Sequence, residues 1–554
     1  MPAKKGLFLL IDALRYDVLA DPAARRFLTP NLDRLAQRGF VRKVVTNAQS
    51  TQFVMPALFS LTYPLDHGGY NNGIRERPKS FAESLHDGGF ETHLLASCNQ
   101  LGVATGYGRG FDTVRTTSDF RVLLEQRIGR TLRYELEMRS VGGKIDAEAL
   151  ALVRKEMTLL LDGIRDLIEH HDKSLWPPKL LHINQRVAAG CVAERALLER
   201  DPQAVMEKVL GIAPGIYWRF LGQKKPSGAR LFWFRAIEAV KWRSRRWIAN
   251  QALWPFLTLS HYPVNFGDIV GPLCRLIEDG KSRSWFIHMH AMDVHDCRAV
   301  NRPFHLIGRL RFLPRWIVGR VKGYTHRRWL YDTAVMYVDR LLGRVIDTLE
   351  RTGQMQDTVV LVTGDHGSQY AESPRTKATV GYRTHYEDIE VPLLIANSGH
   401  ASGPPGLVDS MGVTATFLDA LGAPFHPSYK GQSAFRHGLD AVVCENCGHG
   451  NADIARRDIY FTVTTEAHRM MAVMRGAELQ VEQLYDRAAD PRELRNVAAG
   501  PGARAPIQTM VERLRQERAE IFQLRECGIF SLPSARDEKI PLTPLIHKEN
   551  IKAG

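Results

Sequence analysis

Apolar residues follow two different periods along this chain. The stretches GLFLLIDAL (6–14), WFIHMHA (285–291) and DTVVLVTGDHG (357–367) are largely apolar over the length of a strand, which is typical of strands buried on both faces. In YDTAVMYVDRLLGRVIDTLERTG (331–353) the apolar residues recur every three or four positions, and this spacing predicts an amphipathic helix. Strands that alternate with helices predict an α/β fold with a mostly parallel sheet.

The alternation of strands and helices breaks at two places, and these breaks predict the domain organisation. Residues 120–257 contain many Arg, Leu and Trp and few strand signals, so we expect a helical insertion between two parts of the α/β core at 1–119 and 258–436. Beyond that core the composition becomes mixed and rich in Gly and Ala. It predicts a small C-terminal subdomain at 437–500 and a polar tail with one helix at 501–554.

Polar residues with metal-binding chemistry stand directly after the predicted strands. Asp12, Asp293 and Asp365 lie at the C-terminal ends of three of them, where open α/β sheets place their chemistry. His366 offers an imidazole, and Thr51, in NAQSTQFVMPALFS (47–60), offers a hydroxyl oxygen. Together with Asp12 and Asp365 they could hold one divalent cation such as Zn²⁺, Mn²⁺ or Mg²⁺. Taken singly, each has an ordinary structural explanation: a cap, a turn or a plain Thr.

Longer motifs resemble those of the sulfatase branch of the alkaline-phosphatase superfamily. LLIDALRYD, TPNLDRLAQRG, DTVVLVTGDHG, HYEDIEVPLLIANSG and the late QLYDRAADPRELRNVA match segments of that family in order. The resemblance covers most of residues 6–119 and 284–436. It implies an alkaline-phosphatase-like three-layer α/β/α fold and a metal-dependent hydrolase or transferase that acts on a phosphoryl or sulfuryl ester.

The chain departs from hydrolytic sulfatases where those enzymes keep their nucleophile. They carry a Cys or Ser, the precursor of formylglycine, two residues before a Pro, and an Arg two residues after it. Val54 and Leu58 hold these places around Pro56. Thr51 instead has the spacing seen in the lipid-A phosphoethanolamine transferases, and lipoteichoic acid synthases also use a Thr. The resemblance implies that Thr51 is the nucleophile, with Ser50 as the alternative. The metal ligands that carry over are Asp12, Thr51, Asp365 and His366.

Two further histidines match positions that the family uses to bind the transferring anion. His385 lies in THYEDIEVP and His295 in HAMDVH, and either could stabilise that anion or protonate the leaving oxygen. A satisfied buried histidine is the structural alternative for both. A second metal site built from Asp293, His295 and His385 stays open. Sulfatases often pair two Asp at the first strand, and Ala13 replaces the second here, which disfavours Ca²⁺ relative to the other cations.

Three functions are compatible with these motifs. The first is a metal-dependent hydrolase or transferase that acts on a phosphate ester or phosphodiester through Thr51. The second is a sulfuric ester hydrolase with an unusual nucleophile. The third is a non-catalytic sulfatase-like protein that binds an anionic lipid or glycan. The presence of all four ligand candidates disfavours the third.

Charge adds information about partners and location. Lys and Arg number 74 against 60 Asp and Glu, which favours an anionic partner such as a lipid- or glycan-linked ester. Residues 230–256 interleave Trp with Arg and Lys, so this stretch could contact an anionic membrane surface, or pack its Trp face on the core. Nucleic acid is disfavoured because no recognised binding module is present. We expect a cytoplasmic protein, with peripheral contact at the inner membrane surface.

CENCGHG (444–450) contains a C-x-x-C pair. One such pair supplies half of a zinc site and no second pair follows. We expect Cys444 and Cys447 to be ordinary thiols.

Overall fold

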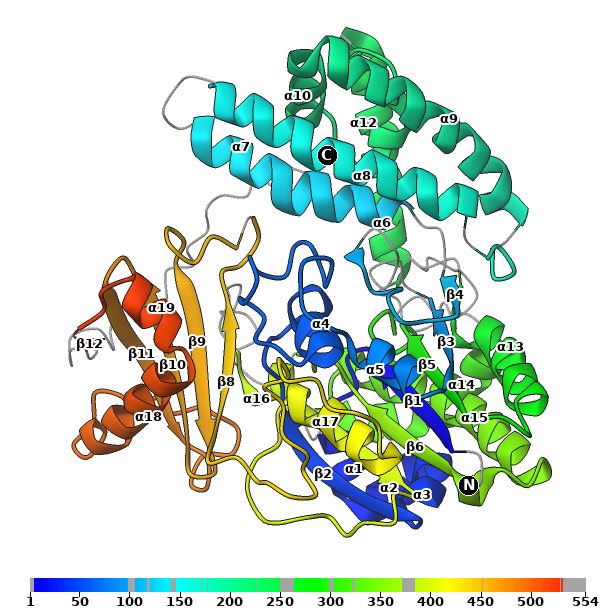
Figure 1. Ribbon diagram of the computed structural model, residues 1–554, viewed down its shortest axis with the longest axis vertical. Coiled ribbons are helices and arrows are strands. Elements are labelled where there is room, and N and C mark those ends of the chain that lie inside the picture. The colour runs from blue at the N-terminus through cyan, green and yellow to red at the C-terminus, as the bar shows by residue number, and fades with distance from the viewer. Residues whose placement is uncertain are drawn as a thin grey trace.

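Two sheets and a helical bundle make up the computed structural model (Figure 1). It describes residues 4–97, 105–116, 120–140, 146–170, 172–176, 178–226, 228–249, 264–297, 303–320, 324–370, 384–450, 452–528 and 530–531.

The larger sheet has seven strands in the order β2-β7-β6-β1-β5-β3-β4. Its neighbours are parallel except where β7 meets β2 and β6. This confirms the predicted α/β fold with a mostly parallel sheet. The strands are β1 (Lys5–Ile11), β2 (Gly39–Val45), β3 (Glu91–Ala96), β4 (Thr113–Thr116), β5 (Trp285–Ala291), β6 (Thr358–Thr363) and β7 (Glu390–Ala396).

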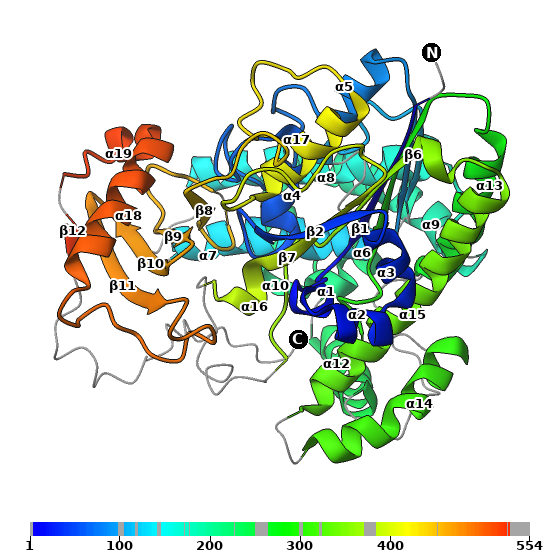
Figure 2. The ribbon, with the colours of Figure 1, turned by 90° about the horizontal axis from the view of Figure 1, so that it is seen from below.

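Helices cover both faces of this sheet, as Figure 2 shows. Successive side chains of β1 enter opposite cores: Leu7 and Leu9 pack on one side, Phe8 and Leu10 on the other, because side chains alternate along a strand. The Leu7 side is covered chiefly by α1 (Asp17–Ala20), α2 (Pro22–Leu28), α3 (Pro30–Ala36), α13 (Phe266–Asp279), α14 (Pro303–Arg320) and α15 (His326–Arg351). The Phe8 side is covered by α4 (Thr51–Ser60), α5 (Phe81–Asp87) and α17 (Ser410–Leu421).

The helical bundle occupies residues 120–249 and lies above the sheet in Figure 1. It has its own apolar core. That core also contains a polar network, in which Lys208 pairs with Glu194 at 2.5 Å and Tyr217 donates to the same carboxylate at 2.6 Å. The bundle consists of α6 (Phe120–Leu124), η3 (Glu125–Leu132), α7 (Arg133–Ser140), α8 (Ala147–His170), α9 (Pro178–Arg200), α10 (Pro202–Gly211), α11 (Pro214–Tyr217), η4 (Trp218–Phe220) and α12 (Gly228–Ala249).

The second sheet follows α17 and runs in the order β12-β11-β10-β9-β8. Its helix α18 differs from the polar tail expected at 501–554. One face of α18 is buried, and its residues are Ile507, Met510, Val511 and Leu514. α18 therefore belongs to the core. Residues 532–554 lie outside the described part. The elements are β8 (Ala441–Asn446), β9 (Ile459–Thr465), β10 (His468–Arg475), β11 (Glu478–Asp486), α18 (Arg504–Glu517), α19 (Ala519–Leu524) and β12 (Phe530–Ser531).

Two short helices complete the chain: η5 (Met355–Asp357) precedes β6 and α16 (Tyr386–Ile389) precedes β7. Within the described residues, none of the helices combines the length and apolar character needed to cross a membrane.

Candidate active site

The candidate site lies where three adjacent strands end. β6, β1 and β5 are neighbours in the sheet, and their C-terminal ends meet at one edge because they run parallel. Asp12 follows β1 directly, and its amide donates to Ala291 O at the end of β5 at 2.9 Å. Asp365 lies two residues beyond the end of β6. The sheet therefore brings together two carboxylates that are 353 positions apart in the sequence.

Asp12, Asp365 and His366 form a cluster with metal-ligand geometry. One ligand atom from each lies within 4.8 Å of the other two, and all three residues are buried. In the described part of the chain this is the single cluster of three His, Cys, Asp or Glu residues with that geometry. The sequence placed these three residues together for the same reason, their positions at strand ends.

Thr51 completes the cluster from the first residue of α4. Its hydroxyl donates to Asp12 Oδ2 at 3.0 Å, and its Oγ1 lies 3.2 Å from His366 Nε2. Ser50 precedes it as the N-cap residue, in extended conformation and with no side-chain capping bond. Thr51 also stands at the positive end of the helix dipole, where a negatively charged group is stabilised.

The orientation of His366 is fixed by its own backbone. Its Nδ1 lies 2.6 Å from Gly367 O, which makes Nδ1 the protonated nitrogen and leaves a lone pair on Nε2 when the ring is neutral. Gly367 packs tightly: its amide donates to Asp388 O at 2.7 Å, and a Cβ there would lie 2.0 Å from Glu387 O. Nε2 therefore faces Asp12, Asp365 and Thr51.

The two buried carboxylates of this cluster would be stabilised by a bound cation. Among the described residues, Asp12 Oδ1 and Asp365 Oδ2 are buried without a hydrogen-bond partner, and an unpaired buried carboxylate oxygen is costly. Burial disfavours the Asp12 carboxylate, but the nearby His295, His290 and His366 outweigh it and hold the pKa of Asp12 below its usual range. Oxygen and imidazole donors converging on one buried point fit a divalent cation of the Zn²⁺, Mn²⁺ or Mg²⁺ type.

The two histidines predicted to bind the anion lie on different elements. The His295 ring is exposed, and its centroid lies 6.2 Å from that of His366. His385 is buried at the N-cap of α16, whose residue Asp388 accepts the Gly367 amide through its backbone oxygen. His295 thus borders the metal cluster, and His385 lies on the helix packed against it.

Asp293 has a structural role in this fold. Its Oδ2 accepts a 2.9 Å hydrogen bond from the amide of Phe266, the first residue of α13. Burial raises the pKa of Asp293 to about 7. It is not part of the metal cluster found among the described residues, so the two-metal alternative gains no geometric support from it.

Comparison with known proteins finds sulfatases and their relatives. The Sulfatase family model matches residues 268–423. A choline-sulfatase of Rhizobium meliloti is 28% identical over 205 residues, which is 35% of this chain and 37% of that protein. The multifunctional alkaline phosphatase superfamily protein PehA of Trinickia caryophylli is 24% identical over 203 residues, 34% of this chain and 39% of that protein.

Comparison of the fold extends over nearly the whole chain. The phosphonate monoester hydrolase of Agrobacterium radiobacter superposes with a TM-score of 0.53 at 17% sequence identity, covering 94% of this chain and 96% of that one. These matches support a place for the chain in the sulfatase and alkaline-phosphatase superfamily. The sequence alignments nevertheless span less than two fifths of either curated relative.

The places where sulfatases keep formylglycine and its supporting Arg are apolar here. Val54 and Leu58 lie inside α4 and are buried in the apolar core. Thr51, one helical turn before Val54, is the residue of α4 that contacts Asp12 and His366. The sulfatase-like site of this chain therefore presents a hydroxyl from the first turn of the helix.

Sequence reasoning missed His290. It lies on β5, fully buried, with Nε2 3.3 Å from Asp12 Oδ2. The quoted motif HAMDVH begins with it, but only the parallel pairing of β5 with β1 brings it beside Asp12. Its position one residue before the end of the strand gave no distinguishing signal.

Glu493 was also missed. Its Oε2 lies 2.9 Å from His385 Nδ1 and accepts the Tyr386 amide at 3.2 Å, while its other oxygen pairs with Arg469. Arg469 in turn pairs with Glu390 at 2.7 Å. Glu493 lies in the late family-like segment QLYDRAADPRELRNVA, so the second sheet, through Arg469, and this segment together position His385.

Cys444 and Cys447 are buried in the second sheet and the loop after it. Burial raises the pKa of each thiol to about 12. Neither belongs to the cluster with metal-ligand geometry found among the described residues.

Proposed function

We propose that this protein is a metal-dependent hydrolase of sulfate or phosphonate esters in which Thr51 is the nucleophile. The observation that carries the proposal is the contact of Thr51 Oγ1 with Asp12 Oδ2 and His366 Nε2, at 3.0 and 3.2 Å. The names of the relatives, choline-sulfatase and phosphonate monoester hydrolase, supply the substrate class. They favour the sulfuric ester alternative over the phosphate ester or phosphodiester that the sequence put first.

Asp12, Asp365, His366 and Thr51 are the residues that would hold the cation. When bound, a divalent cation would lower the pKa of the Thr51 hydroxyl and neutralise charge on the ester. Two contacts in the structure position these residues for that role. Asp12 Oδ2 already accepts the Thr51 proton in a hydrogen bond, and Gly367 O orients His366 so that Nε2 faces the same point.

The remaining groups have roles in binding the anion and releasing the alcohol. The N-terminus of α4 favours the negative charge of the ester beside Thr51. His295, exposed next to His366, would donate a proton to the leaving oxygen. His385, oriented by Glu493, would bind an oxygen of the transferring group. The cycle has two halves: the ester oxygen leaves as Thr51 bonds to sulfur or phosphorus, and water then releases the Thr51 adduct.

A phosphate ester is the second candidate substrate. The observation that favours it is the hydroxyl at Thr51 in place of formylglycine, which matches the phosphoethanolamine transferases at this position. An alcohol acceptor in place of water would then give transfer.

A panel of esters tests the proposal. Chelated protein would be reconstituted separately with Zn²⁺, Mn²⁺, Mg²⁺ and Ca²⁺ and assayed with aryl sulfate, aryl phosphonate, aryl phosphate and diaryl phosphate. We expect turnover that requires metal and falls about a thousandfold or more in Thr51→Ala. Thr51→Ser should keep a measurable part of it, and Ser50→Ala should stay within a few-fold of wild type.

Two outcomes contradict the proposal. Wild-type turnover in Thr51→Ala would remove the nucleophile assignment. Stoichiometric metal binding without turnover of any ester would favour the non-catalytic alternative.

A further inference from the structure

Helix α12 presents a row of large apolar side chains to solvent. Trp233, Ile237, Val240 and Trp247 are separated by four, three and seven positions, a spacing that keeps them on one side of a helix. Their exposed fractions range from 47% for Ile237 to 67% for Val240. The row is ~21 Å long at 1.5 Å per residue. Contiguous exposed apolar surface of this kind marks an interaction site.

The opposite side of α12 anchors it to the bundle. Leu231 is buried in the bundle core and Phe234 packs against it. Glu238 lies 3.5 Å from Arg219. Because Leu231, Phe234 and Glu238 make contacts of α12 with the bundle, the exposed row lies on the face that does not pack on the core. Trp233 and Trp247 are exposed and do not pack on the core, contrary to the alternative in which the Trp face of this segment does so. Residues 250–256 of the predicted segment lie outside the described part.

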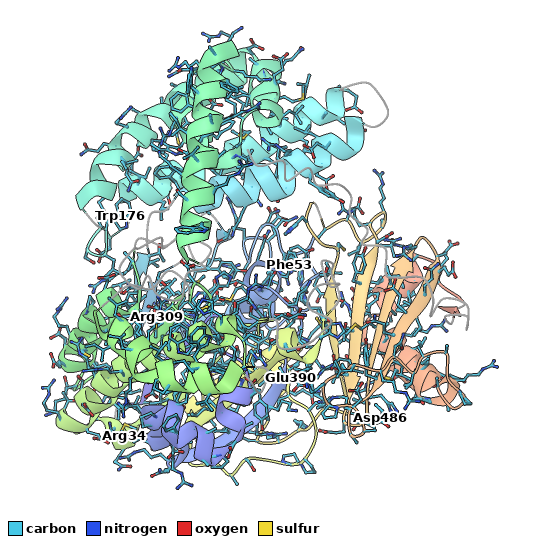
Figure 3. The ribbon with its side chains drawn as sticks, turned by 180° about the vertical axis from the view of Figure 1, so that it is seen from behind. Arg34, Phe53, Trp176, Arg309, Glu390 and Asp486 are labelled. Atoms are coloured by element: carbon cyan, nitrogen blue, oxygen red, sulfur yellow. The ribbon has the colours of Figure 1, made fainter. Side chains whose placement is uncertain are left out.

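Helix α14 carries a second exposed apolar row. Ile307, Leu310, Ile317 and Val318 are each more than half exposed, whereas Phe312 on the other side is buried against the core. Figure 2 shows α12 and α14 along the same edge of the molecule, and Figure 3, seen from behind, shows both at the front. The two helices therefore lie on the same side of the molecule, and we call their two rows together the α12–α14 face.

The positive charge of this face favours an anionic partner. α12 contains six Arg or Lys and one Glu, and α14 contains four Arg and no acidic residue. Arg230, Lys241, Arg243 and Arg311 are exposed beside the apolar rows. Exposed Trp flanked by basic residues is the composition of helices that lie in the interface of an anionic membrane. A second copy of this chain would instead bring two strongly basic helices together, which costs electrostatic energy.

We propose that the α12–α14 face docks on the surface of an anionic lipid bilayer. The apolar rows would enter the boundary between head groups and acyl chains, and the basic side chains would contact the anionic head groups. Neither helix needs to cross the bilayer. The inference does not depend on the proposed hydrolase activity, because it rests on surface residues outside the metal cluster.

Vesicle sedimentation of the full chain tests this proposal. Vesicles of phosphatidylcholine alone would be compared with vesicles that contain phosphatidylglycerol, at low and high salt. We expect binding to the anionic vesicles at low salt and release at high salt. Trp233→Ser/Ile237→Ser/Val240→Ser and, separately, Ile307→Ser/Leu310→Ser/Ile317→Ser should each weaken binding at least about tenfold.

A matched control separates docking from general hydrophobicity. Phe425→Ser/Leu494→Ser/Leu524→Ser removes three exposed apolar side chains from elsewhere on the surface, and we expect it to bind as wild type does. Lys241→Glu/Arg243→Glu should weaken binding to the vesicles that contain phosphatidylglycerol and leave binding to phosphatidylcholine vesicles unchanged. Circular dichroism and thermal melting would establish that each variant is folded.

Three results overturn the proposal. The first is failure of the wild type to bind anionic vesicles. The second is unchanged binding by both folded triple variants. The third is a stable dimer in sedimentation velocity that both triple variants lose, because it would assign the face to a second copy of the chain.

Discussion

At the scale of single residues, the site depends on side chains whose orientation is fixed by neighbours. Gly367 O sets the ring of His366, and the Asp12 carboxylate accepts the Thr51 hydroxyl. His385 is set in the same way by Glu493. An outer residue that orients a functional histidine typically changes activity by ~10- to 100-fold when it is replaced.

Glu493 therefore offers a test of how His385 is positioned. Glu493→Gln replaces a carboxylate acceptor with a neutral amide, so it should lower kcat/KM by ~10- to 100-fold with little change in metal content. His385→Ala should cause a similar loss, and the double variant should be no worse than the more affected single variant. The measurement is ester turnover by the four proteins, with Glu512→Gln on α18 as an exposed control.

Additive losses in that double variant would contradict the positioning role. They would show that Glu493 acts on the site through some contact other than His385 Nδ1.

The proximity of the site residues was predictable where a motif carried them. Asp12, Asp365, His366 and Thr51 converge as expected because each stands at the end of a strand or the start of a helix. His290 and Glu493 could not be found in this way. Their partners, Asp12 and His385, lie 278 and 108 positions away, and only strand pairing and the second sheet bring them together.

At the scale of elements, the apolar pattern predicted the core strands and helices well. β5 and β6 lie inside the stretches that the pattern marked, whereas β1 and α15 begin one and five residues before theirs. The pattern also predicted a helix within 501–554, but it missed the burial of α18, because a helix with many Arg and Glu was interpreted as part of a polar tail. Its buried stripe packs on the second sheet, and a helix needs only one apolar face for that.

The packing of α18 gives a stability prediction. Leu514 is fully buried, so Leu514→Ala should lower the free energy of unfolding by ~2–5 kcal/mol through lost apolar contact and the cavity left behind. Gln508→Ala, on the exposed side of the same helix, should change it by less than about 0.5 kcal/mol. Urea unfolding followed by circular dichroism measures both. If both variants have the same free energy of unfolding, α18 does not pack on the core and is part of the polar tail that the sequence predicted.

A buried carboxylate links α15 to the start of α3. Asp339 accepts hydrogen bonds from the amides of Leu32 and Asn31 at 2.8 and 3.2 Å. Burial raises its pKa to about 6 in the folded protein, whereas an unfolded Asp titrates near pH ~4.

The sign of the resulting pH dependence follows from linkage. Because the folded state holds the proton more tightly, stability is greatest below pH ~4 for this group and falls as the pH rises to about 6. The total effect is at most ~3 kcal/mol. Asp339→Asn carries no proton to lose, so the free energy of unfolding measured in chelator between pH 4 and 7.5 should decline less than in wild type. Parallel pH profiles would contradict this assignment.

At the scale of the whole molecule, the described residues form three large apolar cores, one on each side of the large sheet and one in the helical bundle, besides a smaller cluster that includes Val45 and Ile389. The second sheet shares the core on the Phe8 side, which is why its residue Arg469 can support the site through Glu493. Sequence patterns predicted the layers of the large sheet because those patterns are local. They could not predict how the second sheet meets the site, since that depends on contacts between segments far apart in the chain.

Trapping the reaction intermediate would show directly whether Thr51 is the nucleophile. The metal-loaded protein would be quenched during turnover of a slow phosphonate or sulfate ester, digested and examined by mass spectrometry, with metal-loaded Thr51→Ala as the control. We expect one added phosphonyl or sulfuryl group on Thr51 in the wild type and none in the variant. An adduct on Ser50, or turnover by Thr51→Ala at the wild-type rate, would contradict it.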